Sequence, residues 1–254
     1  MSGTQGVEGF TRSAIQSAIL QRASTVTSAS GPTVVLVHAV NPFGFSQLRR
    51  VNENNVDLNR NWLSTDEFAD ATAADPNRNG YMDVYDLLNP LPSGGTWRMH
   101  LEFLKSCVDI AKKGLGAVKQ AMVSATYHSS QGIFFGGFEK QPSLVLLEKF
   151  LVETVGINKT KHLSVVDVHT GLGPSGVDTI ILTPEFGTVP FLSVLKALIE
   201  ENAYYQHAPT RRTPFAQKLR DVFYVHESSY WRQSVIDRGL SVFKKVYNHA
   251  SVAL

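Results

Sequence analysis

The sequence has little cysteine, no long apolar run and almost no net charge. Cys107 is the only cysteine among 254 residues, so no disulfide can form within the chain, and a cytoplasmic protein is expected. No apolar run approaches the ~18 residues of a membrane span, and no apolar segment follows a basic one at the start. With 24 basic and 22 acidic residues, net charge indicates neither a nucleic acid nor a membrane as partner. Small polar or peptidic ligands remain the open class.

The apolar segments favour one α/β domain covering residues 1–254. A hydrophobic content of 43% is enough for a sizeable buried sheet. Residues 33–40, 163–168 and 179–183 are rich in β-branched side chains, as is typical of strands. Helical spacing of apolar residues predicts helices at 11–22, 83–88, 97–123, 143–155, 190–202 and 228–248. Because strands and helices alternate, we predict a mixed, mainly parallel sheet flanked by helices on both faces.

The asparagine-rich segment, residues 51–62, is the most polar feature of the chain. It holds five asparagines and three charged residues. Asparagine and aspartate tolerate irregular backbone and bond to their own main chain, so we predict a rigid loop beside the sheet. Within it, Arg60 offers a planar guanidinium suited to bidentate capture of a carboxylate. An ordinary hydrogen-bonded surface loop is the alternative interpretation.

Several motifs agree in identity and order with one known superfamily. Asn41-Pro42-Phe43-Gly44 follows the predicted strand at 33–40, and Asp57-Leu58-Asn59-Arg60-Asn61-Trp62 comes later. These segments resemble the zinc carboxypeptidases, the carboxypeptidase A-like metallopeptidase superfamily. An uncharacterised branch of that superfamily, a domain family of unknown function, is the closest likeness. The segments that resemble this branch are 49–53, 134–137 and 167–173.

The resemblance implies a site for one zinc ion. In the superfamily a His-x-x-Glu pair and a later histidine bind the metal; Glu8 matches the glutamate and His169 the later histidine. Gln5 stands where the first histidine is expected. An amide oxygen is a poor substitute for imidazole on zinc, so we expect weakened zinc affinity or none. Without the resemblance, Glu8 is simply an acid that complements a helix N-terminus.

The resemblance also implies catalytic and substrate-binding groups. Glu185 follows a predicted strand and matches the glutamate that takes a proton from the metal-bound water and returns it to the leaving group. Arg49 or Arg50 would polarise the scissile carbonyl. Asn59 and Arg60 would hold the terminal carboxylate of the substrate. For Glu185 alone, an ordinary acid at a strand end is the alternative.

The first residues form a glycine-rich turn that leads into the helix predicted at 11–22. In α/β folds such a turn normally follows a strand. We therefore expect a zinc carboxypeptidase-like sheet that lacks at least one early N-terminal strand, with an exposed edge available for self-association. An unusual but complete edge is the alternative.

Two classes of function follow. The first is a zinc-dependent hydrolase that cleaves an amide bond adjacent to a free carboxylate, in a peptide or, as a deacylase or amidohydrolase, in an N-acyl amino acid. The second is a catalytically impaired or truncated relative that binds carboxylate-bearing ligands or a protein partner; Gln5 and the missing strand support it.

A calcium-binding loop is an alternative use of residues 75–86. Oxygen-bearing side chains and Gly80 fit the spacing of a helix-loop-helix calcium loop. Pro76, an aspartate at the last position and the lack of a predicted helix before the loop oppose this interpretation.

Overall fold

A computed structural model describes residues 1–89, 101, 105, 107–108, 110–169 and 229–252. The chain divides into two compact units. Unit 1 comprises Met1–Gly3, Glu8–Ala39 and Ile157–Leu254, and unit 2 comprises Thr4–Val7 and Val40–Gly156. The single domain expected over residues 1–254 stays a prediction. Glu185 and the elements expected at 179–183 and 190–202 lie outside the described residues.

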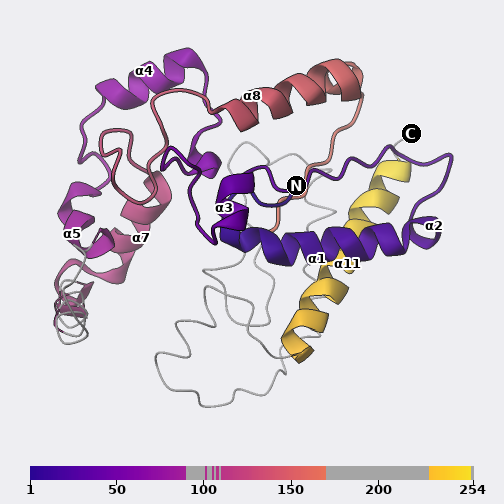
Figure 1. Cartoon of the computed structure of the whole chain (residues 1–254), viewed down its shortest axis with the longest axis horizontal. Helices are drawn as coiled ribbons and strands as arrows, with labels where there is room; N and C mark the ends of the chain where they lie inside the picture. Colours follow the sequence, from indigo (N-terminus) through magenta and orange to yellow (C-terminus); the bar gives the residue numbers. More distant parts are fainter. Residues whose placement is uncertain (90–100, 102–104, 106, 109, 170–228, 253–254) are drawn as a thin grey trace. The chain divides into compact units, whose positions relative to one another are not determined.

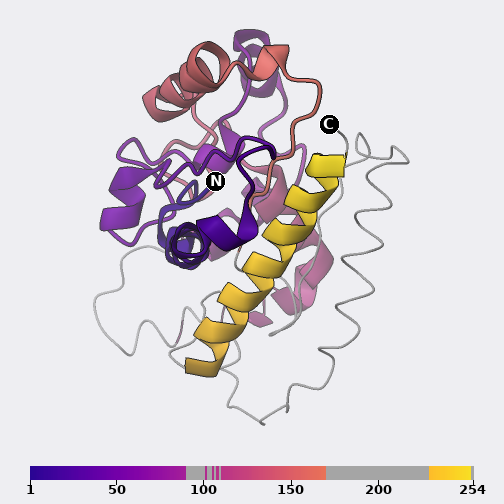
Figure 2. The same cartoon turned by 90° about the vertical axis from the view of Figure 1, so that its right-hand side faces the viewer.

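Two helices of unit 1, α1 (Gly9–Gln21) and α11 (Ser229–Val252), pack against each other (Figures 1 and 2). Their contact is apolar, and Leu240 is the buried residue that α11 contributes to it. Gly239 permits a close approach, because a Cβ atom placed there would lie 2.6 Å from the side chain of Ile15. The helices predicted at 11–22 and 228–248 are therefore confirmed. The buried residues of α1 in this contact are Ile15, Ala18 and Ile19.

Unit 1 also contains two short helical segments, α2 (Ala23–Val26) and η5 (Ile157–Lys159). Tyr247 of α11 ties the stretch after α2 to the long helix, since its hydroxyl accepts a 2.7 Å hydrogen bond from the Ser28 amide. Leu36 and Val168 pack against the α1–α11 core from segments without regular structure. Chain segments that are far apart in the sequence thus share one small core.

Unit 2 consists of short helices joined by hydrogen-bonded loops. The helices predicted at 83–88 and 143–155 are confirmed, whereas the one predicted at 97–123 is interrupted at Gly114, whose φ of 84° is not helical. The helical segments of this unit are α3 (Pro42–Ser46), η2 (Leu58–Arg60), α4 (Thr65–Ala73), η3 (Met82–Val84), α5 (Tyr85–Leu88), α7 (Leu115–Ser124), α8 (Pro142–Lys149) and η4 (Phe150–Val155).

The prediction of a mainly parallel sheet is wrong for the part of the chain that the structure describes. That part contains helices and loops and no strand; its β-pairing is an isolated parallel bridge between Thr126 and Phe135. Val35 lies exposed in the segment expected to be a buried strand, and Leu163 and Val165 lie exposed in the strand expected at 163–168. The same described residues contain no sheet edge that lacks an N-terminal strand.

The reason for this error is that β-rich composition does not provide pairing partners. β-branched residues favour extended chain, but a strand forms only where neighbouring strands take up its amide and carbonyl groups. The segment at 33–40 bonds to other parts of unit 1. The Ser2 amide and the Gln16 side chain donate to the Val37 carbonyl at 2.8 and 2.9 Å, and the Ala39 amide donates to the Ser2 hydroxyl at 3.3 Å.

None of the described helices is both long enough and apolar enough to cross a bilayer.

Replacing Gly239 with valine should lower the free energy of unfolding by about 1–3 kcal/mol, because the new side chain would overlap Ile15. Urea unfolding followed by circular dichroism measures this change. Asn248→Val, at an exposed position of the same helix, is the matched control and should change stability by less than about 0.5 kcal/mol. Equal stability of Gly239→Val and the wild type would contradict the close packing of α1 and α11.

Candidate functional site

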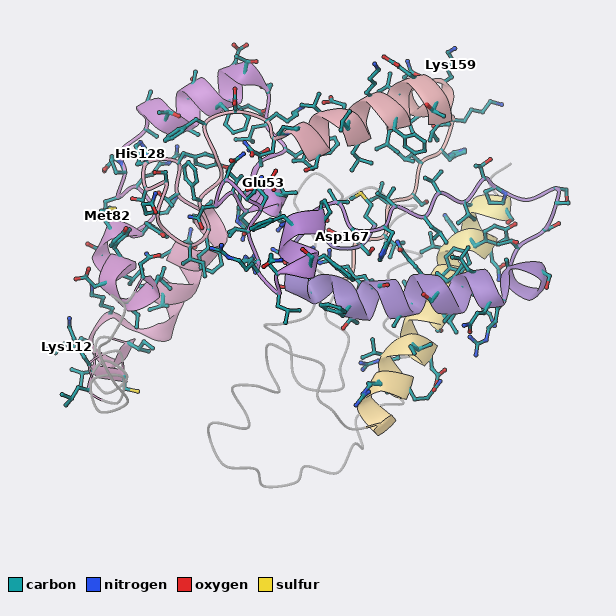
Figure 3. The ribbon with its side chains drawn as sticks, in the orientation of Figure 1. Glu53, Met82, Lys112, His128, Lys159 and Asp167 are labelled. Atoms are coloured by element: carbon teal, nitrogen blue, oxygen red, sulfur yellow. The ribbon has the colours of Figure 1, made fainter. Side chains whose placement is uncertain are left out.

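Four ionisable side chains of unit 1 converge beside the first turns of α1, where Figure 3 labels Asp167. Glu8 ends the short helical turn η1 (Gly6–Glu8), and Arg12 follows it by four residues, so both lie on one face of the helical stretch. Asp167 and His169 flank Val168, which packs into the core. We call Glu8, Arg12, Asp167 and His169 the His169 cluster.

Arg12 is the most deeply buried member of the cluster, with 1% of its side chain exposed. Its Nη1 lies 3.0 Å from Asp167 Oδ1, and its Nη2 lies 3.6 Å from Glu8 Oε2. A buried guanidinium cannot lose its proton and must be paired. Arg12 therefore fixes the positions of both carboxylates.

His169 lies between the same two carboxylates. Its Nε2 is 3.0 Å from Asp167 Oδ2, and its Nδ1 is 3.8 Å from Glu8 Oε2. The first distance is a hydrogen bond, and the second is longer than one. Glu8 and His169, which the sequence motifs suggested as zinc ligands, are thus neighbours in the folded unit.

The environment of Asp167 favours its charged form. Burial alone would raise the pKa of Asp167, but the hydrogen bond with His169 and the positive charge of Arg12 outweigh burial, so the pKa lies below its ordinary value. Asp167 is consequently ionised near neutral pH and can only accept hydrogen bonds.

The Glu8–His169 pair fits zinc in part. Two donor atoms about 2.0–2.1 Å from one tetrahedral zinc ion lie roughly 3.3 Å apart, and 3.8 Å is close to that separation. Gln5 is buried but belongs to unit 2, whereas Glu8 and His169 belong to unit 1. Within the described ranges, no three or more His, Cys, Asp or Glu side chains are grouped so that they could hold a metal ion. The pair therefore supplies two donors of an incomplete ligand set.

In unit 2, the asparagine-rich segment forms the hydrogen-bonded loop that its composition predicted. The Asn52 side-chain oxygen accepts from the amides of Asn54 and Val56 at 3.1 and 2.8 Å. The buried Asn61 side chain donates to the Gly136 carbonyl at 2.7 Å and accepts from the Gln141 amide at 2.6 Å. These bonds join the loop to residues 136–141 and make its backbone rigid.

Within this loop, Asp57 holds Arg50. Asp57 is fully buried, and its Oδ2 accepts from Arg50 Nε at 2.8 Å while its Oδ1 accepts from the Asn59 amide at 3.1 Å. The Arg50 guanidinium also lies 4.9 Å from the centre of the Phe134 ring, within range of a cation–π contact. Arg49, in contrast, is exposed. Of the two arginines considered for carbonyl polarisation, Arg50 is therefore the one whose guanidinium is held in place by the loop.

Asn59 and Arg60 lie in η2, directly after this ion pair. Asn59 is exposed and Arg60 is half-buried. The Tyr127 hydroxyl donates to the Arg60 carbonyl at 2.7 Å, and burial raises the pKa of Tyr127, so its hydroxyl keeps its proton at neutral pH. The Arg60 backbone is thereby fixed. Recognition of a substrate carboxylate by these two residues stays a prediction.

Sequence reasoning missed Arg12 and the partner of Arg50. Arg12 could have been found from its spacing, because it follows Glu8 by four residues at the start of a predicted helix. Asp57 belongs to one of the motifs that resemble the superfamily, but nothing in the linear pattern says which arginine it pairs with. Both residues act through pairings that only the folded chain brings about.

The polar loop at 75–86 bonds to itself. Asn77 Oδ1 accepts from the Met82 amide at 3.0 Å, and Asp83 Oδ1 accepts from Asn77 Nδ2 at 3.1 Å. A calcium ion would need these same oxygens as ligands, so the hydrogen bonds within the loop compete with calcium binding. The expectation that no helix precedes this loop was wrong, since α4 ends at Ala73.

The chain belongs to a family described as "Protein of unknown function (DUF2817)", whose model matches residues 1–185 and 178–238. Membership of an uncharacterised family was expected from the motifs at 49–53, 134–137 and 167–173, and that expectation is confirmed. No curated protein and no solved structure matches the sequence.

Replacing Asp57 with asparagine should lower the free energy of unfolding by about 1–3 kcal/mol, because asparagine has no charge to pair with Arg50 and only one acceptor oxygen for the two hydrogen bonds that Asp57 accepts. Glu53→Gln is the matched control: Glu53 is an exposed acid of the same loop, labelled in Figure 3, and its replacement should have little effect. Urea unfolding measures both. Similar losses in the two variants would show that the Arg50–Asp57 pair does not stabilise the loop.

The lowered pKa of Asp167 predicts a pH-dependent contribution to stability. A depressed folded-state pKa stabilises the chain above the unfolded value of about 3.9, and this contribution is lost as pH falls through the lower folded value. The stability difference between the wild type and Asp167→Asn should thus be largest above about pH 4 and shrink in stronger acid. Urea unfolding of chelator-treated protein across this range measures it. A difference that is independent of pH would contradict the shift.

Proposed function

We propose that the chain is a zinc-dependent hydrolase that cleaves an amide bond adjacent to a free carboxylate, with chemistry similar to that of zinc carboxypeptidases. The observation that carries this proposal is the 3.8 Å separation between Glu8 Oε2 and His169 Nδ1. Both residues matched metal ligands on motif grounds alone, and they are far apart in the sequence. Two acceptor atoms at this separation are stabilised by a cation that both can reach.

Zinc bound at this pair would supply a water molecule acidic enough to act as the nucleophile. The residues of the cluster then have separate tasks. Glu8 contributes an anionic oxygen and His169 a neutral nitrogen, while Arg12 holds the Glu8 carboxylate in place from 3.6 Å. Glu185 is the proposed base on the strength of the family resemblance.

For unit 2 we propose recognition of the substrate. Arg50 would polarise the scissile carbonyl, and Asn59 and Arg60 would hold the substrate carboxylate. The support is preorganisation: Asp57 and Phe134 already hold the Arg50 guanidinium, so less conformational freedom is lost when a ligand binds. A peptide with a free C-terminus and an N-acyl amino acid both carry the required groups, so a deacylase is a variant of the same proposal.

A binding protein without hydrolytic activity is the second candidate, and two observations favour it. Gln5 stands where the resemblance expects a histidine. In addition, Arg12 already places a cation 3.6 Å from Glu8 and 3.0 Å from Asp167. A fixed guanidinium lowers the affinity of nearby carboxylates for a metal ion. In this case the arginines of unit 2 would bind carboxylate-bearing ligands that are not cleaved.

Zinc titrated calorimetrically into the metal-stripped full chain should bind at about one ion per chain. Glu8→Gln and His169→Ala should each weaken binding by more than about tenfold, since even partners behind direct ligands typically contribute 10–100-fold. His162→Ala is the matched control, because His162 is an exposed histidine of the same unit. Gln5→His should tighten binding if position 5 supplies the third ligand.

Hydrolysis is then assayed on zinc-loaded protein with a panel of N-acetyl amino acids and hippuryl dipeptides, by detection of the released amine. Release that depends on Glu8 and His169 supports the hydrolase. Zinc binding only after Gln5→His, without turnover by the wild type, supports the binding protein. Absence of zinc binding in both forms overturns the metal site altogether.

A further inference from the structure

The His169 cluster contains a carboxylate, Asp167, to which the proposed zinc binding gives no task. We propose that Asp167 is a positioning residue that sets the tautomer of His169, with the proton on Nε2 and the lone pair on Nδ1, the nitrogen nearest Glu8. The use of this tautomer for metal binding rests on the proposed function, but the tautomer itself is a property of the metal-free chain.

The hydrogen bond between Asp167 and His169 determines which ring nitrogen carries the proton. Asp167 Oδ2 and His169 Nε2 are 3.0 Å apart. An ionised carboxylate has no proton to give, so the nitrogen must be the donor. A neutral imidazole carries a single N–H, which leaves Nδ1 as the acceptor nitrogen.

The Asp167 carboxylate is itself held in place by Arg12. Its other oxygen, Oδ1, lies 3.0 Å from Nη1 of Arg12, which is almost fully buried at the start of α1. Each carboxylate oxygen therefore has its own partner. Val168, the residue between Asp167 and His169, packs against the core of unit 1. Arg12 of α1 thus holds Asp167, and Asp167 in turn orients the His169 ring.

The other ring nitrogen, Nδ1, faces Glu8. It lies 3.8 Å from Glu8 Oε2, so a lone pair on Nδ1 and the Glu8 carboxylate can serve one cation together. The opposite tautomer would put a proton on this nitrogen and prevent it from binding metal. A carboxylate behind a metal-binding histidine also raises the basicity of the ring. Asp167 would in this way strengthen zinc binding without touching the ion.

The alternative is that Asp167 merely neutralises Arg12, and Asp167→Asn distinguishes the two. Arg12 offers only donors, so the asparagine oxygen should turn to Arg12 and the asparagine NH₂ group to His169 Nε2. That nitrogen must then accept, and the proton moves to Nδ1. A purely structural role predicts loss of stability without a change of tautomer.

The experiment uses the full chain labelled with ¹⁵N-histidine and stripped of metal, at about pH 8, above the ordinary imidazole pKa of about 6.5. Long-range ¹H–¹⁵N correlation spectra separate the two tautomers, and His169→Gln assigns the signal. We expect Nε2–H in the wild type and Nδ1–H in Asp167→Asn. Asp237→Asn, at an exposed carboxylate of the same unit, should leave the spectrum of His169 unchanged.

Nδ1–H in the wild type, or the same tautomer in the wild type and Asp167→Asn, would overturn the inference. The wild-type spectrum remains decisive if the variant does not fold. Zinc titration gives the second readout: Asp167→Asn should weaken binding by about 10–100-fold. A wild type that binds no zinc but shows Nε2–H would refute the proposed function and leave the positioning role standing. If the wild type binds zinc but Asp167→Asn changes neither the tautomer nor the zinc affinity, the positioning role is refuted and the proposed function stands.

Discussion

The chemistry of unit 1 depends on the buried charge of Arg12. A guanidinium that is 1% exposed can neither lose its proton nor reach water, so the fold must supply anions for it. It does so from two directions, with Glu8 at the start of α1 and Asp167 in a distant segment. Both carboxylates are therefore ordered before any ligand binds. His169 lies against the same two carboxylates, so Arg12 orients the His169 ring through them. The sequence had instead predicted that His169 is positioned by the edge of a sheet.

Unit 2 uses the opposite arrangement of charge. There the buried ion is a carboxylate, Asp57, and the partly exposed ion is Arg50. Unit 1 thus presents electron-pair donors, a carboxylate and an imidazole, whereas unit 2 presents a guanidinium held in a hydrogen-bonded loop. Donors of the first kind suit a metal cation, and a fixed guanidinium suits a carboxylate or a polarised carbonyl. Unit 1 therefore contains groups suited to the metal binding proposed for it, and unit 2 contains a group suited to the substrate recognition proposed for it.

The helices and the polar loop could be predicted from the sequence, whereas the sheet and the key ion pairs could not. The spacing of Ile15, Ala18 and Ile19 reports one buried helix face, and such a face is a local property. A strand is not local, because apolar β-branched runs say nothing about which segments pair. The same limit explains Arg12 and Asp57. Their partners are fixed by tertiary packing, and only the pairing of Glu8 with His169 was accessible, through motif order.

Gln5 and Arg12 bear on the choice between hydrolase and binding protein in different ways. With a neutral His169, two carboxylates and one guanidinium leave the His169 cluster with net negative charge. The cluster therefore still attracts a cation, so Arg12 reduces metal affinity without abolishing it. Gln5 bears on the ligand count, since catalytic zinc sites typically use three protein donors and an amide oxygen is a weaker zinc ligand than imidazole. Arg12 thus bears on how strongly the Glu8–His169 pair attracts a cation, whereas Gln5 bears on the number of donors that the family resemblance implies.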